Sequence, residues 1–173
     1  VWGWKVEGAP PNLKKYIIVV APHTSNWDFL VGLLYRRYTP GFNPKYLAKK
    51  ELFVFPFGYI FRALGGYPVE RGKHTNFVDS VVDVFNSKVS FSTTITPEGT
   101  RSYSPKWRTG FYYIAKKAEV PIIRIGFDYG TMTVHIDEPY YITKDVEETV
   151  VDFKKHFSQF KGKNPKDGVR WPE

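Results

Sequence analysis

Short apolar runs and helical periodicities alternate along most of the chain. Residues 16–21 form a continuous β-branched run that predicts a buried strand, and Pro22 ends it. Apolar residues then recur at helical spacing, which predicts a helix over residues 26–38 with Ser25 as its N-cap. The same patterns predict further strands at residues 45–48, 67–69, 89–95, 122–127 and 132–136, and further helices at residues 56–64, 77–85, 108–118 and 146–160.

This alternation predicts an α/β fold with a central mixed, largely parallel sheet flanked by helices. At 173 residues, without an internal repeat or a long linker, the chain is expected to be a single domain over residues 1–173. Chemistry in such folds gathers in the loops that follow the carboxyl ends of strands. Two polar loops in that position, residues 22–28 and 96–102, are therefore the candidate sites.

The first polar loop pairs a histidine with an aspartate. Five residues turn a helix by about 500°, so His23 and Asp28 meet only if the histidine lies in the loop and the aspartate in the first helical turn. An aspartate on one ring nitrogen fixes the tautomer, and the other nitrogen then accepts a proton from a nucleophile. The spacing from Ser25 to Asp28 also fits a capping box, which stabilises a helix without catalysis. Locally, both interpretations stay open.

The second polar loop has the composition of an anion-binding turn. Gly99 permits a positive φ, Thr100 offers a hydroxyl, and Arg101 offers a planar guanidinium suited to phosphate. Arg71, which precedes a glycine, is a second candidate for the same chemistry. The alternative for both arginines is a tight turn in which the side chain is solvated or paired with the neighbouring glutamate.

Charge and composition restrict the partners. The chain carries a net charge of +8, concentrated in residues 1–50 and 151–173, which favours a phosphate-bearing partner. No nucleic-acid-binding motif is found, so an anionic membrane or an anionic small molecule is expected and nucleic acid is not. The absence of cysteine excludes disulfides, a thiolate metal site and a cysteine nucleophile. With four histidines, no metal site is expected. No apolar stretch approaches the ~20 residues of a spanning helix, and no secretory leader is found.

Four sequence blocks occur in a fixed order: His23-x4-Asp28, residues 66–71 ending in Arg71, the run Pro-Glu-Gly-Thr-Arg-Ser at residues 97–102, and Val-Pro-Ile-Ile at residues 120–123. In this the chain resembles the glycerolipid acyltransferases, typified by lysophosphatidic acid acyltransferase. The resemblance implies a glycerol-3-phosphate acyltransferase-like fold. The chain departs from the family pattern at two positions: Arg124 stands where a second proline is common, and Thr96 stands where an aromatic residue is common. The amino-terminal membrane helices of the family are also absent from this sequence.

The resemblance implies transfer of a fatty acyl group from acyl-CoA or acyl carrier protein to a hydroxyl of a lyso-glycerophospholipid, first of all lysophosphatidic acid, which would become phosphatidic acid. It implies a His23–Asp28 general base, no acyl-enzyme, and no cofactor besides the thioester co-substrate. The residues implied to bind substrate are Arg71, Glu98, Gly99, Thr100 and Arg101. The residues implied to contact the acyl chain or donor are Val120, Pro121 and Ile122.

The aromatic-rich segment 52–64 is a candidate wall for an acyl-chain groove, and simple core packing is its alternative. Basic residues flank it at Lys45, Lys49, Lys50 and Arg62, an arrangement suited to an anionic bilayer. We therefore expect a cytoplasmic protein that is peripheral on the inner membrane face. Two alternatives remain: an acyltransferase for another lyso-lipid or an amino-acid lipid, and a non-catalytic protein that binds anionic lipid or nucleic acid.

Overall fold

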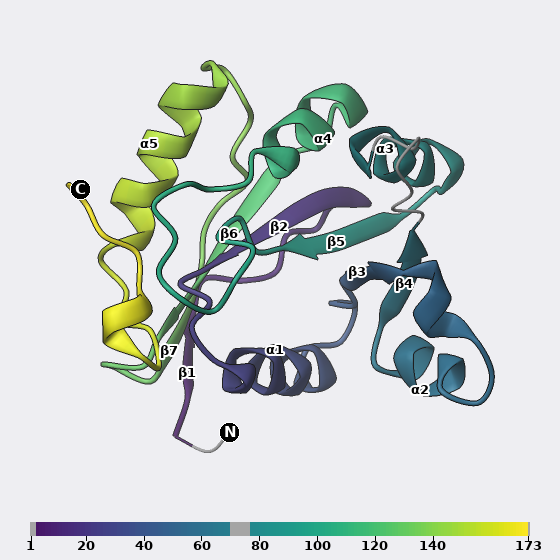
Figure 1. Ribbon diagram of the computed structural model, residues 1–173, viewed down its shortest axis with the longest axis horizontal. Helices are drawn as coiled ribbons and strands as arrows, with labels where there is room; N and C mark the ends of the chain where they lie inside the picture. Colours follow the sequence, from purple (N-terminus) through teal and green to yellow (C-terminus); the bar gives the residue numbers. More distant parts are fainter. Residues whose placement is uncertain (1–2, 70–76, 173) are drawn as a thin grey trace.

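The computed structural model describes residues 3–69 and 77–172, and within them helices cover both faces of one sheet (Figure 1). The strands are β1 (Lys5–Glu7), β2 (Lys15–Ala21), β3 (Lys45–Lys49), β4 (Gly66–Val69), β5 (Phe91–Ile95), β6 (Ile122–Asp128) and β7 (Thr133–Ile136). The helices are α1 (Asn26–Tyr38), α2 (Gly58–Ala63), α3 (Phe77–Ser87), α4 (Gly110–Ala118) and α5 (Val146–Phe157), with 3-10 turns η1 (Lys50–Phe53) and η2 (Pro165–Asp167).

The strand order is β1-β7-β6-β2-β5-β3-β4 among the residues described. All pairs from β6 to β4 are parallel, β7 runs antiparallel to β6, and β1 runs parallel to β7. The mixed, largely parallel sheet predicted from the sequence is therefore confirmed. The pattern missed β1, because a three-residue, solvent-exposed edge strand carries no apolar run.

Strand β2 is the centre of the fold because successive residues face opposite sides and almost all are buried. Ile17 and Val19 join the core under α3, α4 and α5. Ile18 and Val20 join the core on the α1 side, together with Ile123 of β6. Figure 1 shows α1 on one side of β2 and β6, opposite α3, α4 and α5.

The pairing of β2 determines where the site can form. Val19 is in register with Ile95 of β5, and Ala21 is in register with Gly126 of β6. Three segments therefore leave the sheet side by side at the carboxyl ends of these strands: the loop into α1, the loop into α4, and the turn into β7. Both candidate loops from the sequence lie at this edge, as an α/β fold requires.

The helix predicted over residues 26–38 is confirmed with both ends correct. Five other predictions were longer than the structure. The helices predicted over residues 56–64, 108–118 and 146–160 span Gly58–Ala63, Gly110–Ala118 and Val146–Phe157, and the strands predicted over residues 89–95 and 132–136 span Phe91–Ile95 and Thr133–Ile136. None of the helices in the described ranges has the length and apolar character needed to cross a bilayer.

Candidate active site

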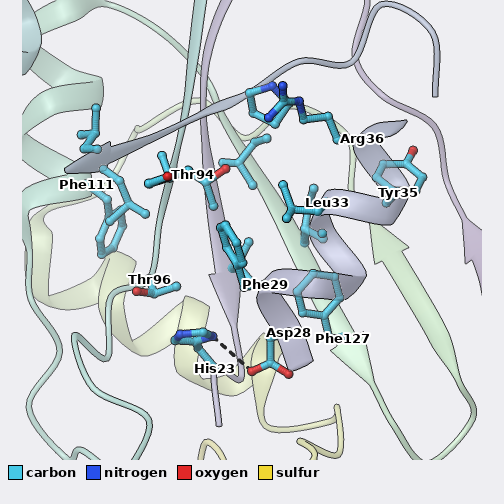
Figure 2. A pocket seen from close by; sticks show the side chains of 18 of the residues that line it. His23, Asp28, Phe29, Leu33, Tyr35, Arg36, Thr94, Thr96, Phe111 and Phe127 are labelled. Atoms are coloured by element: carbon cyan, nitrogen blue, oxygen red, sulfur yellow. Dashed lines mark ion pairs between the residues drawn. The ribbon is translucent and has the colours of Figure 1, made fainter. Parts of the chain in front are cut away.

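His23 and Asp28 meet as the loop geometry requires. The Nδ1 atom of His23 lies 3.1 Å from Oδ2 of Asp28, and Figure 2 marks this ion pair with a dashed line. Ser25 is the N-cap of α1 and accepts from the backbone N–H of Trp27 at 3.2 Å, which fixes Asp28 in the first helical turn. The capping box and the His–Asp pair are both present, so the two interpretations of this spacing do not exclude each other. With Nδ1 turned to Asp28, Nε2 is the ring nitrogen left for a ligand.

The Asp28 carboxylate is buried and surrounded by donors, with 2% of the residue exposed. The backbone N–H groups of Thr24 and Ser25 each donate to Oδ2 at 2.9 Å. The hydroxyl of Tyr129 donates to Oδ1 at 2.7 Å. Donors on both oxygens stabilise the ionised form, so a charged carboxylate is tolerated in the interior. Tyr129 was not identified as a site residue from the sequence, although its position directly after a buried strand could have indicated that it lies at the same edge of the sheet.

Glu98 lies beside the same histidine and is also buried. Its Oε2 accepts from the backbone N–H of His23 at 2.9 Å, and its Oε1 has no hydrogen-bond partner among the described residues. Burial raises the pKa of the Glu98 carboxyl to about 7, and the Asp28 charge adds to the rise, although the hydrogen bond and charge of His23 oppose it. The Glu98 side chain therefore holds the histidine loop by accepting from the backbone of His23, and its carboxyl titrates near neutrality.

The remaining residues of the second loop lie further out. Thr100 and Arg101 are exposed, and the Thr100 hydroxyl accepts from the Ser102 backbone N–H at 3.3 Å. Gly99 has a φ of +68°, and a Cβ there would meet the side chain of Arg108. The positive φ is the reason for glycine at this position, because the flexible arginine side chain can move away. Arg71 lies outside the described residues.

Arg108 is a cation that the sequence interpretation missed. It lines a cavity that also contains His23, Asp28 and Gly99. Its backbone N–H donates to the carbonyl of Pro97 at 2.7 Å, which ties the start of the α4 segment to the second loop. Little in the sequence indicated that Arg108 belongs to the site, because it is separated from the Pro-Glu-Gly-Thr-Arg-Ser run and lies in a stretch predicted to be a helix.

The cavity has a volume of about 700 Å³ and is lined by α1, by the sheet and by the first residues of α3 and α4. This is within the ~300–1,000 Å³ of small-molecule sites. In Figure 2, His23 and Asp28 lie at one end of the cavity, and Arg36 lies at the other. The apolar residues that form most of its wall are Ile18, Val20, Phe29, Leu33, Phe42, Leu47, Ile95, Phe111, Ile125 and Phe127.

Two expectations about the acyl groove do not match this cavity. Of segment 52–64, only Leu64 is among the described residues that line it, so the prediction of that segment as the wall was wrong. The segment extends into solvent instead: Phe55 is 84% exposed and Tyr59 is 70% exposed. Val120, Pro121 and Ile122 are buried where the chain enters β6 and do not line the cavity, and Val120 and Ile122 belong to the core beneath α4 and α5.

The comparison with known families agrees with this geometry. The model of the Acyltransferase family matches residues 5–128, which include both candidate loops and the strands that position them. The chain therefore belongs to the Acyltransferase family, and it has the domain of an enzyme that transfers acyl groups. No curated protein matches the chain significantly. Within residues 3–69 and 77–172, no group of three or more His, Asp or Glu side chains is arranged to hold a metal ion.

The raised pKa of Glu98 predicts a pH-dependent contribution to stability. The neutral carboxyl is favoured in the folded protein, so this contribution is fully present below pH ~4.5 and is lost as the pH rises to about 7. Relative to Glu98→Gln, wild-type protein should lose roughly 3 kcal/mol of unfolding free energy across that interval. Urea unfolding of both proteins from pH 4 to 8 measures the difference, and a difference independent of pH would contradict the assignment.

Proposed function

We propose that this protein transfers a fatty acyl group from an acyl thioester, acyl-CoA or acyl carrier protein, to a hydroxyl of a lyso-glycerophospholipid, with lysophosphatidic acid as the first candidate acceptor. The observation that carries the proposal is the His23–Asp28 pair at the end of an apolar cavity. Family membership supports acyl transfer, and the cavity supports a fatty chain as the group transferred.

The proposed mechanism is direct transfer with His23 as the base. Nε2 removes the acceptor hydroxyl proton while the oxygen attacks the thioester carbonyl carbon, and a tetrahedral intermediate forms. Asp28 stabilises the imidazolium produced in this step. Collapse of the intermediate breaks the carbon–sulfur bond, and the imidazolium returns its proton to the departing thiolate. The chain has no cysteine, which fits a route without a thioester-linked enzyme.

His23→Ala should therefore lower kcat by about 10²–10⁴-fold, the usual contribution of a general base. The assay follows radiolabelled acyl-CoA or acyl carrier protein into phosphatidic acid with lysophosphatidic acid as acceptor. His135→Ala is the matched control, since His135 lies on β7 and does not line the cavity. Turnover retained in His23→Ala would contradict the assignment of the base, and a pool of other lyso-lipids and amino-acid lipids tests the alternative acceptors.

The acceptor phosphate needs a cation near the histidine. Arg108 lines the cavity beside Gly99, so we assign it to the phosphate together with Arg71 and Arg101, which the family resemblance implies. A guanidinium fits two phosphate oxygens at once. Glu98 then acts on the histidine loop, and the backbone near Gly99 and Thr100 remains available to the acceptor.

Arg108→Gln should raise the KM for lysophosphatidic acid about tenfold, the size expected for losing a charge-assisted hydrogen bond. It should leave the KM for the thioester within a factor of about two, because the acceptor alone carries the phosphate in question. Lys106→Gln, an exposed cation two residues away, is the control. An unchanged acceptor KM in Arg108→Gln would exclude a phosphate contact at this position.

We also propose that the protein binds the surface of an anionic bilayer through segment 52–64. The segment exposes Phe55 at 84%, Phe57 at 62% and Ile60 at 57%, far more than a core segment would. Arg62 within this segment and Lys49 shortly before it in the sequence are exposed cations. Apolar side chains inside a basic rim are typical of proteins that insert shallowly among anionic headgroups. A cytoplasmic protein on the inner membrane face would fit this surface.

The double substitution Phe55→Ser/Phe57→Ser should weaken binding to phosphatidylglycerol-containing vesicles by about tenfold or more, because two large apolar side chains no longer insert. Vesicle co-sedimentation measures the binding, and added salt should weaken it further. Val89→Ser is the matched control, since Val89 is 80% exposed but precedes the amino end of β5. Equal binding to neutral and anionic vesicles would argue against this surface.

A further inference from the structure

We propose that Tyr129 is a positioning residue for the His23–Asp28 pair, in that its hydroxyl holds one oxygen of Asp28 so that the other oxygen faces the imidazole. This inference rests on the proposed function of His23 as the base. Tyr129 donates to Oδ1 at 2.7 Å, whereas Nδ1 of His23 lies 3.1 Å from Oδ2. The two carboxylate oxygens therefore have different partners, and the tyrosine fixes which oxygen the histidine meets.

Tyr129 is itself held firmly at the end of β6. Its backbone N–H donates to the carbonyl of Lys161 at 2.8 Å. Its ring packs edge-on against Trp4, with ring centroids 4.9 Å apart. Nζ of Lys163 lies 5.5 Å from the centroid of the same ring. A tyrosine held through its backbone and its ring by two separate segments, the amino-terminal strand region and residues 161–163, positions its hydroxyl better than a mobile surface tyrosine could.

The hydroxyl also moderates the charge that the histidine experiences. Burial, with the hydrogen bond to Asp28 and its charge, raises the pKa of the Tyr129 hydroxyl, so it stays a donor at neutral pH. A carboxylate that accepts this hydrogen bond shares part of its charge with the donor, so it stabilises an imidazolium less than a free carboxylate would. This suits a base that must return its proton to the leaving thiolate in the same turnover.

The charged groups around His23 come from each element packed there. Asp28 comes from α1, Glu98 and Arg108 come from the loop between β5 and α4, and Lys163 comes from the carboxyl-terminal tail. Tyr129→Phe keeps the ring and leaves all four of these groups in place. A change in the titration of His23 in this variant is therefore attributable to the hydroxyl.

The experiment measures the imidazole of His23 by NMR in ¹⁵N-histidine-labelled protein, with His23→Gln used to assign its signals. In Tyr129→Phe the titration midpoint of His23 should move to higher pH, and the acid limb of the kcat/KM profile should move with it. At pH 7, kcat should fall about tenfold with the acceptor KM unchanged, the size expected for one hydrogen bond to a charged group. Tyr141→Phe, at a 62% exposed tyrosine, should change neither quantity.

An unchanged titration and an unchanged profile in Tyr129→Phe would overturn the inference. So would an equal effect of Tyr129→Phe in an Asp28→Asn background, because a hydroxyl that acts through the carboxylate has no target once its charge is removed. The NMR measurement does not depend on turnover. A shifted midpoint in a protein that transfers no acyl group would therefore leave the positioning role intact and reject the proposed function alone.

Discussion

The constraint on which this site depends is the burial of one carboxylate. Asp28 is 2% exposed, and a buried charge is costly unless donors replace the water that it loses. Those donors come from the histidine loop, through Thr24 and Ser25, and from the far end of β6, through Tyr129. One group therefore joins two loops and the start of α1, so the histidine loop cannot shift without leaving a charge uncompensated.

The same junction explains why a cavity of about 700 Å³ persists beside a well-packed sheet. Protein interiors normally close such space, because voids forfeit contacts. Here the amino end of α1 is fixed at the sheet edge by Asp28, and further along the helix the Arg36 guanidinium donates to the carbonyl of Leu64 at 2.7 Å. Held at two points, α1 keeps Phe29 and Leu33 in the cavity wall.

Local signals in the sequence predicted the elements and the candidate loops, because capping and periodicity act over a few residues. Ser25 and Asp28 are an example: their spacing predicted both the start of α1 and the pair with His23. Contacts between residues far apart in the sequence left no such local pattern. The hydrogen bond from the His23 backbone to Glu98 spans 75 residues, and the hydrogen bond from Tyr129 to Asp28 spans 101 residues. Composition also misled: segment 52–64 is aromatic-rich, but aromatic content does not distinguish a cavity wall from an exposed surface.

Arg124 shows how strand alternation resolves a departure from the family pattern. It lies in β6 between Ile123 and Ile125, which pack on the α1 side with the cavity, so its own side chain faces the other way. There its guanidinium lies 2.8 Å from Oδ2 of Asp137 and 5.5 Å from the centroid of the Phe153 ring of α5. An arginine in place of proline therefore serves the packing of α5. The cavity wall on the opposite face of the strand stays apolar, so this departure leaves the cavity unchanged.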